Sequence, residues 1–150
     1  MPDTPPDRPT DDASDEPSSP FPLASGTSLD ETLGIEYQEV SPTRVRATMP
    51  VGPRVHQPLG YLHGGASVVL AESVASVGAT TAALPEKVAF GLEINANHLR
   101  PKKDGTLHAT GTPIHQGRTT AVWEIRVTDE ADRLVCISRC TLALVNAGSR

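Results

Sequence analysis

The chain has 150 residues, of which 37% are hydrophobic and only 3% aromatic, so we expect one domain whose core is built from aliphatic side chains. The net charge of −5 comes from residues 1–20, which hold six acidic side chains against Arg8 alone, and the twelve acidic and twelve basic residues that remain cancel. This balance excludes the basic surface typical of nucleic-acid or membrane binding, and no uninterrupted apolar run reaches the roughly 18 residues of a membrane span.

The first 20 residues are rich in Pro, Asp and Ser and nearly free of apolar side chains. This composition predicts a disordered tail over 1–25 and a single domain over 26–150. The chain does not open with the basic and then apolar pattern of a signal peptide, so a cytoplasmic location is expected. Cys136 and Cys140 would lie about 13 Å apart along one strand, which predicts two free thiols and no zinc site.

The predicted elements begin with a short helix at 28–34, where Ser28 and Glu31 form a capping-box pattern. Alternating segments at 35–40 and 43–51 predict two antiparallel strands. A loop rich in Gly and Pro over 52–65 comes next.

A long apolar helix is predicted over Gly64–Ala83, because the stretch is about 20 residues long and shows no alternation. Pro85 ends it. Since it is apolar on nearly every side, we expect it to be buried nearly all round.

Four further segments carry strand-like patterns separated by turn signals: 87–99, 105–116, 119–129 and 133–145. In the third, Trp123, Ile125 and Val127 alternate with more polar positions, which is typical of a sheet with one packed face. The order of elements therefore predicts an α+β fold, in which a curved antiparallel sheet wraps around one long central helix.

Glu72 lies in the middle of this apolar helix, where an unpaired carboxylate costs several kcal/mol. No basic residue occurs between Arg54 and Lys87. Among its helical neighbours three and four positions away, only Ser76 can form a hydrogen bond. Glu72 is therefore a candidate for chemistry; the alternative is an exposed acid in a groove.

The motif His63-Gly64-Gly65 opens the helix. Its free backbone N–H groups, with the positive end of the helix dipole, suit a carbonyl oxygen or an oxyanion, although a tight turn would explain the glycines equally well. Gly64 and Glu72 are about 12 Å apart along the helix, whereas one reacting carbonyl must lie about 3 Å from both groups. If they act together, the protein is a two-fold homodimer with composite sites.

Polar residues in the loops could complete such a site. Gln57 could bind a carbonyl or a water, and the turns holding Arg100, Lys102, Lys103 and Arg118 suit phosphate groups; a surface amide and solvated turns are the alternatives. The sequence has no Walker pattern and no GxGxxG motif.

Two stretches, "QPLGYLHGGASVVLAESVASVGA" and "GLEINANHLRP", resemble the hotdog-fold acyl-CoA thioesterases. The resemblance covers about 28–146 and is greatest to the branch of the 1,4-dihydroxy-2-naphthoyl-CoA hydrolases, the enterobactin proofreading thioesterases and the Arthrobacter-type 4-hydroxybenzoyl-CoA thioesterases. It implies a hotdog fold and hydrolysis of aromatic or bulky acyl-CoA substrates, with menaquinone biosynthesis as one setting. It also implies a dimer of dimers and no cofactor, since coenzyme A is part of the substrate.

The same resemblance implies a role for individual residues. Glu72 is the catalytic carboxylate, acting either as nucleophile or as base for water, and the Gly64 N–H polarises the thioester carbonyl. Gln57 and His63 shape the loop around the reacting group, and Ser76 assists one turn beyond Glu72. The implied coenzyme A contacts are Gly91, His98, Leu99, Arg100, Pro101, His115, Gln116, Gly117, Arg118, Thr119 and Thr120, with the phosphates at Arg100 and Arg118; Lys102 and Lys103 lie in a turn that varies between relatives.

Two other functions fit part of this pattern. His63 with Glu72 could serve an enoyl-thioester hydratase or dehydratase, and a non-catalytic protein could bind acyl-CoA without turnover. A buried carboxylate argues against pure binding, because binding alone gives no reason to keep it there.

Overall fold

The computed structural model describes residues 28–148. Its elements are α1 (Leu29–Leu33), β1 (Glu36–Val40), β2 (Val45–Val51), the 3₁₀ turn η1 (Pro53–Val55), α2 (Gly64–Ala83), β3 (Lys87–His98), β4 (Gly105–Gln116), β5 (Thr120–Thr128) and β6 (Leu134–Asn146). This order confirms the predicted succession of short helix, two strands, long helix and four strands. The predicted acidic tail over 1–25 lies outside the described residues.

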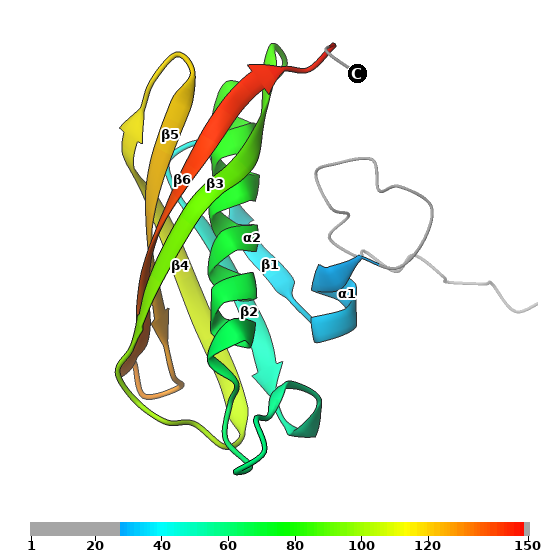
Figure 1. Ribbon diagram of the computed structural model, residues 1–150, viewed down its shortest axis with the longest axis vertical. Coiled ribbons are helices and arrows are strands. Elements are labelled where there is room, and N and C mark those ends of the chain that lie inside the picture. The colour runs from blue at the N-terminus through cyan, green and yellow to red at the C-terminus, as the bar shows by residue number, and fades with distance from the viewer. Residues whose placement is uncertain (1–27, 149–150) are drawn as a thin grey trace, which may run out of the picture.

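All six strands form one antiparallel sheet in the order β1-β2-β4-β5-β6-β3. The sheet curves around α2, which lies across its concave face (Figure 1). This arrangement confirms the predicted α+β architecture of one central helix wrapped by an antiparallel sheet. The side of α2 that faces away from the sheet is therefore not covered by any strand within residues 28–148.

The core contains the inward positions that the alternation predicted. Val45, Ala47 and Met49 of β2 are buried. On β5, Trp123, Ile125 and Val127 are fully buried as well. Cys136 and Cys140 are buried free thiols on β6.

Helix α2 packs against β2, β3, β4, β5 and β6. By length and composition alone, α2 could cross a bilayer, because its mean hydropathy is 1.3. A count of uninterrupted apolar residues does not detect this property, since the Ser and Thr residues that interrupt the run lower the mean hydropathy only slightly. The packing of α2 identifies it as the core helix of the fold and not a membrane span.

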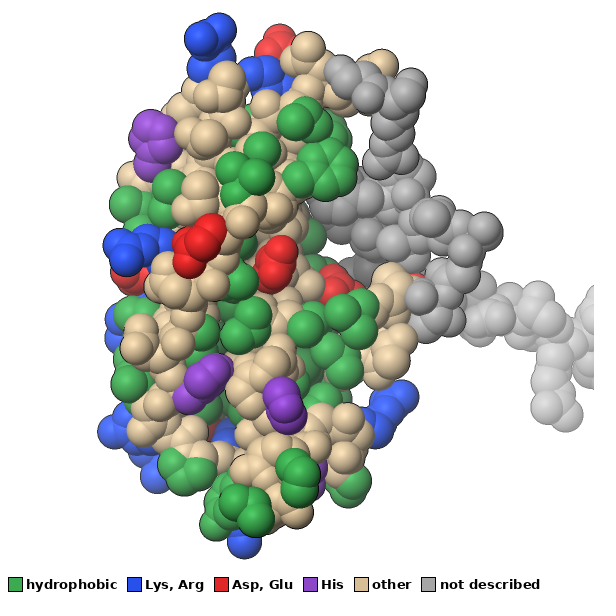
Figure 2. All heavy atoms as spheres, in the orientation of Figure 1, with side chains coloured by type: hydrophobic (Ala, Val, Ile, Leu, Met, Phe, Trp, Pro, Cys, Tyr) green, Lys and Arg blue, Asp and Glu red, His purple; other side chains and the backbone are tan. Residues whose placement is uncertain are grey.

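The expectation that α2 is buried nearly all round is wrong. One side, with Leu70, Ala71, Val74 and Ala75, is fully buried. The other side is only half-buried, and it comprises Val68, Val69, Glu72, Ser73 and Ser76. The physical reason is that the curved sheet of a single chain covers only one side of the helix. Figure 2 shows hydrophobic side chains exposed over the face on which β3 and α2 lie.

Candidate active site

The first turn of α2 is prepared by the residue before it. His63 is the N-cap, and its Nδ1 accepts a 2.9 Å hydrogen bond from the Gly65 N–H. Among residues 28–148, no acceptor takes a hydrogen bond from the Gly64 N–H. A donor at the positive end of a 20-residue helix is thus left for a ligand oxygen.

His98, the last residue of β3, lies directly against Gly64. A Cβ atom at Gly64 would be 2.8 Å from His98 Nε2, closer than real contacts allow, so any side chain at position 64 would require the His98 ring to shift. His98, which the family resemblance had assigned to coenzyme A, therefore lies beside the donor proposed for the reacting carbonyl.

A cavity of about 390 Å³ extends from this contact. Its walls are the loop residues Gln57, Tyr61 and Leu62, the helix residues Gly64 and Ser67, and the stretch 98–102. One chain thus brings together the predicted catalytic loop and the first of the two predicted coenzyme A segments.

The loop that carries Gln57 is held in place by the β3–β4 connection. The Leu62 N–H donates to the Lys102 carbonyl at 2.7 Å, and His56 Nε2 lies 2.6 Å from the Lys103 carbonyl. Gln57 Oε1 accepts the Leu59 N–H, so the amide NH₂ is the part of Gln57 that remains to donate to a ligand in the cavity.

Ser67 is a cavity residue that the sequence reasoning missed. Its side chain is only 1% exposed, and its hydroxyl has no partner among the described residues. It lies three positions after Gly64, on the same side of the first helical turns. That spacing, together with a polar residue in an apolar helix, was the available signal.

Glu72 lies away from this cavity and reaches across to β3. Its Oε1 ends against Gly91, where a Cβ atom would be 2.3 Å away. Among residues 28–148, the Glu72 carboxylate has no hydrogen bond and no ion pair, and no hydrogen bond links it to the Ser76 side chain. Burial raises the pKa of the nearby Cys140 thiol to about 12, and the negative charges of Glu72 and Glu93 add to this shift.

The structure does not bring all predicted site residues together within one chain. Gly64 and Glu72 remain about 12 Å apart along α2. The segments 98–101 and 115–120 lie at opposite ends of β4, a 12-residue strand about 36 Å long. In Figure 1 the β4–β5 turn is at the top of the sheet and the β3–β4 connection at the bottom.

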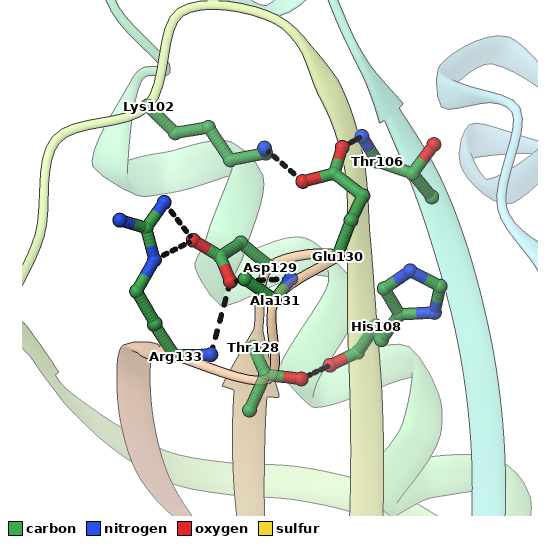
Figure 3. Close-up of polar contacts among 8 residues, drawn as sticks. All are labelled: Lys102, Thr106, His108, Thr128, Asp129, Glu130, Ala131 and Arg133. Carbon is green, nitrogen blue, oxygen red and sulfur yellow. Dashed lines mark hydrogen bonds and ion pairs between the residues drawn. The ribbon is translucent and has the colours of Figure 1, made fainter.

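The basic residues near the cavity differ in what they already bind. Lys102 Nζ contacts Glu130 Oε2 at 2.7 Å (Figure 3), and this hydrogen bond, with one from the Thr106 N–H, lowers the pKa of Glu130 to about 2. Lys103 Nζ lies 4.9 Å from the centre of the Tyr61 ring. Arg100 donates from Nη1 to the Leu134 carbonyl at 2.8 Å and is otherwise exposed, so its remaining N–H groups can meet an anion at the rim.

Comparison with known proteins supplies the wider context. Residues 59–136 match the model of the Thioesterase superfamily. The chain is 53% identical over 116 residues to a 1,4-dihydroxy-2-naphthoyl-CoA hydrolase of Listeria monocytogenes, covering 77% of this chain and 94% of that protein. It is 45% identical over 113 residues to the protein of the same name from Escherichia coli, covering 75% and 83%. The crystal structure of a Haemophilus influenzae thioesterase matches with a TM-score of 0.78 at 43% identity, covering 82% of this chain and 86% of that one.

Proposed function

Since the chain belongs to the Thioesterase superfamily and is a thioester hydrolase, we propose that it hydrolyses acyl-CoA with an aromatic or otherwise bulky acyl group to the free acid and coenzyme A. The observation that carries this proposal concerns residues 28–148: the Glu72 carboxylate on the core helix has no hydrogen-bond or ion-pair partner there, and the first N–H of the same helix has no acceptor. The name of the Listeria relative makes 1,4-dihydroxy-2-naphthoyl-CoA the first specific substrate to test.

In the proposed reaction, the Gly64 N–H binds the thioester carbonyl oxygen and stabilises the negative charge that develops on it. Glu72 either takes a proton from the water that attacks the carbonyl carbon, or attacks that carbon itself to form a mixed anhydride, which water then hydrolyses to release the acid and restore the carboxylate. The C–S bond breaks, the thiolate of coenzyme A leaves and gains a proton, and water supplies the second oxygen of the acid. The Gln57 amide orients the carbonyl or the water, and Ser76 assists near Glu72.

The proposed site is composite and needs a homodimer. Antiparallel packing of two chains would bring together groups that are far apart in one chain. These groups are Gly64 and Glu72, about 12 Å apart along α2, and the segments 98–101 and 115–120. Gly64 of one copy then lies near Glu72 of the partner subunit. Arg100 and Arg118 from different copies would hold the phosphates of one coenzyme A.

The β3 strand supports this assembly. It is a 12-residue edge strand with Phe90 and Leu92 more than half exposed, and a long apolar edge of this kind is normally paired or covered. Antiparallel pairing of β3 with β3 of a second copy would cover it and the half-buried side of α2. We propose a dimer of dimers of this kind in the cytoplasm.

The test compares the wild type with Glu72→Ala, following thiol release from benzoyl-CoA and from 1,4-dihydroxy-2-naphthoyl-CoA. We expect Glu72→Ala to lower kcat by about 10³-fold or more, with Glu86→Ala, an exposed acid beyond the helix, as the matched control. A variant that keeps most of the wild-type kcat contradicts the mechanism.

Two further readings separate the other functions. Loss of enoyl absorbance from crotonyl-CoA without thiol release would indicate a hydratase, and binding without turnover would indicate an acyl-CoA binding protein. A panel of aryl and alkyl acyl-CoA substrates then tests the preference for bulky acyl groups.

A further inference from the structure

The contact between Glu72 and Gly91 joins the central helix to the edge strand of the sheet. An ideal Cβ atom at Gly91 would lie 2.3 Å from Glu72 Oε1, 3.4 Å from Cδ and 3.9 Å from Cγ. The approach is therefore closest at the carboxylate oxygen itself. Any side chain at position 91 would occupy the space that this oxygen fills.

The local form of β3 explains why position 91 faces the helix. Three residues of this strand pack against the core: Ala89, Ile94 and Ala96. Ala89 and Ile94 are an odd number of positions apart, whereas residues on one face of a regular strand are an even number apart. The register with β6 shifts between Gly91 and Glu93, which marks a bulge at Leu92. Because a bulge adds one residue to the strand, inward positions are odd before it and even after it.

Gly91 is consequently the inward position between Ala89 and Ile94, and it is the one that lacks a side chain. The gap that it leaves in the inner face of β3 is where the Glu72 oxygen lies. No hydrogen bond or ion pair within residues 28–148 holds that carboxylate. Within the described residues, the position of the Glu72 carboxylate is therefore defined by the shape of this gap.

We propose that Gly91 is a positioning residue for the reaction: the absence of a side chain there lets the Glu72 carboxylate lie against β3, in the place from which it acts. This inference rests on the proposed function of Glu72. This role differs from the coenzyme A contact that the family resemblance implies for Gly91. A positioning role depends on the length of the side chain at position 72, whereas a contact with coenzyme A does not.

The test is a double-mutant cycle measured with the full chain and benzoyl-CoA. In the wild-type background, Gly91→Ala should lower kcat by about 10- to 100-fold, as expected for a displacement on the order of 1 Å, with KM changed less than about threefold. Glu72→Asp shortens the side chain by one C–C bond of about 1.5 Å. In that background Gly91→Ala should therefore cost less than about threefold, because the carboxylate no longer reaches position 91.

The control is Gly52→Ala, since a Cβ atom there meets nothing within 4 Å, and it should leave kcat unchanged. A Gly91→Ala penalty of the same size in both backgrounds, or a rise in KM without loss of kcat, overturns the positioning role. If Gly91→Ala folds only in the Glu72→Asp background, the steric contact is supported. If it folds in neither background, β3 itself requires the glycine and the proposal is wrong.

Crystal structures of the wild type and Gly91→Ala give a readout that does not depend on activity. The variant must move the Glu72 oxygen from 2.3 Å to at least 3.0 Å from the new methyl group, and we expect the carboxylate to move while β3 stays. A strand that shifts around an unmoved carboxylate contradicts the inference. Failure of the proposed function would instead appear as full activity of Glu72→Ala, whatever these structures show.

Discussion

Ser73, the residue after Glu72 on the central helix, donates a 2.6 Å hydrogen bond from its hydroxyl to Asp30 Oδ1. The other oxygen of Asp30 accepts a 2.7 Å hydrogen bond from Tyr37. Burial, with the neighbouring Asp30, raises the pKa of Tyr37, so the phenol stays a donor at all ordinary pH values. Asp30 thereby ties α1, β1 and α2 together at the level of the candidate active site.

Ser73 and Ser67 form a matched pair for a stability test, because both lie on α2 and only Ser73 has a partner in the described chain. Ser73→Ala removes a hydrogen bond to a charged group and should lower the unfolding free energy by about 1.5–3 kcal/mol. Ser67→Ala removes a buried, unpartnered hydroxyl and should be neutral or stabilise by up to about 1 kcal/mol. Urea unfolding followed by the fluorescence of the single, buried Trp123 measures both; a larger loss for Ser67→Ala than for Ser73→Ala would refute the contrast.

Cys140 should give the folded protein a specific sensitivity to alkali. Its thiol pKa rises from 9.0 to about 12 on folding, so between these values the folded protein keeps a proton that the unfolded chain has lost. The unfolding free energy must then fall as pH rises, by up to about 1.4 kcal/mol per pH unit. Denaturant unfolding at about pH 7.5 and about pH 10.5 should show a smaller fall in Cys140→Ala than in the wild type, and Cys136→Ala should keep the Cys140 contribution. An identical fall in the wild type and Cys140→Ala would contradict the shift.

Arg100 and Lys102 should differ in their effect on substrate affinity. Arg100 is exposed, and within the described residues only Nη1 of its side chain donates a hydrogen bond, so its other guanidinium N–H groups can bind a phosphate. Lys102 is instead paired with Glu130, and its side chain is only 12% exposed. Arg100→Gln should raise KM for acyl-CoA about tenfold by the loss of a charged phosphate contact, and Lys102→Met should change it less than about threefold. With acyl-pantetheine, which lacks the nucleotide phosphates, the Arg100→Gln effect should vanish; if it persists, Arg100 does not bind phosphate.

Composite sites should allow two inactive variants to complement each other. Gln57→Ala and Glu72→Ala would damage the same site from different chains. A dimer with one chain of each type then has one doubly altered site and one intact site. Random co-expression should restore about a quarter of wild-type activity. Co-expressed chains that are no more active than the average of the two parents would show that each site lies within a single chain.

Much of the fold was predictable from the sequence because its signals are local. The alternation around Trp123 and the capping pattern at Ser28 both specify an element from a few neighbouring residues. The apolar stretch from Gly64 to Ala83 likewise marked the helix and made Glu72 conspicuous. The structure confirms these elements and shows the capping box formed at α1.

The arrangement of the candidate site was decided only by the tertiary structure. No local pattern tells that Gly91 meets Glu72, that His98 lies on Gly64, or that 98–101 and 115–120 lie at opposite ends of the sheet. The bulge at Leu92 reverses the inward alternation of β3, and the curvature of the sheet leaves one side of α2 half-covered.

The sequence by itself therefore determined which elements form and which residue types carry the chemistry, since periodicity and capping act over a few positions. Which of those residues meet depends on contacts between segments far apart in the chain. Such contacts follow from how the helix and the sheet pack as whole elements, and small side chains matter there chiefly through the space they leave to others.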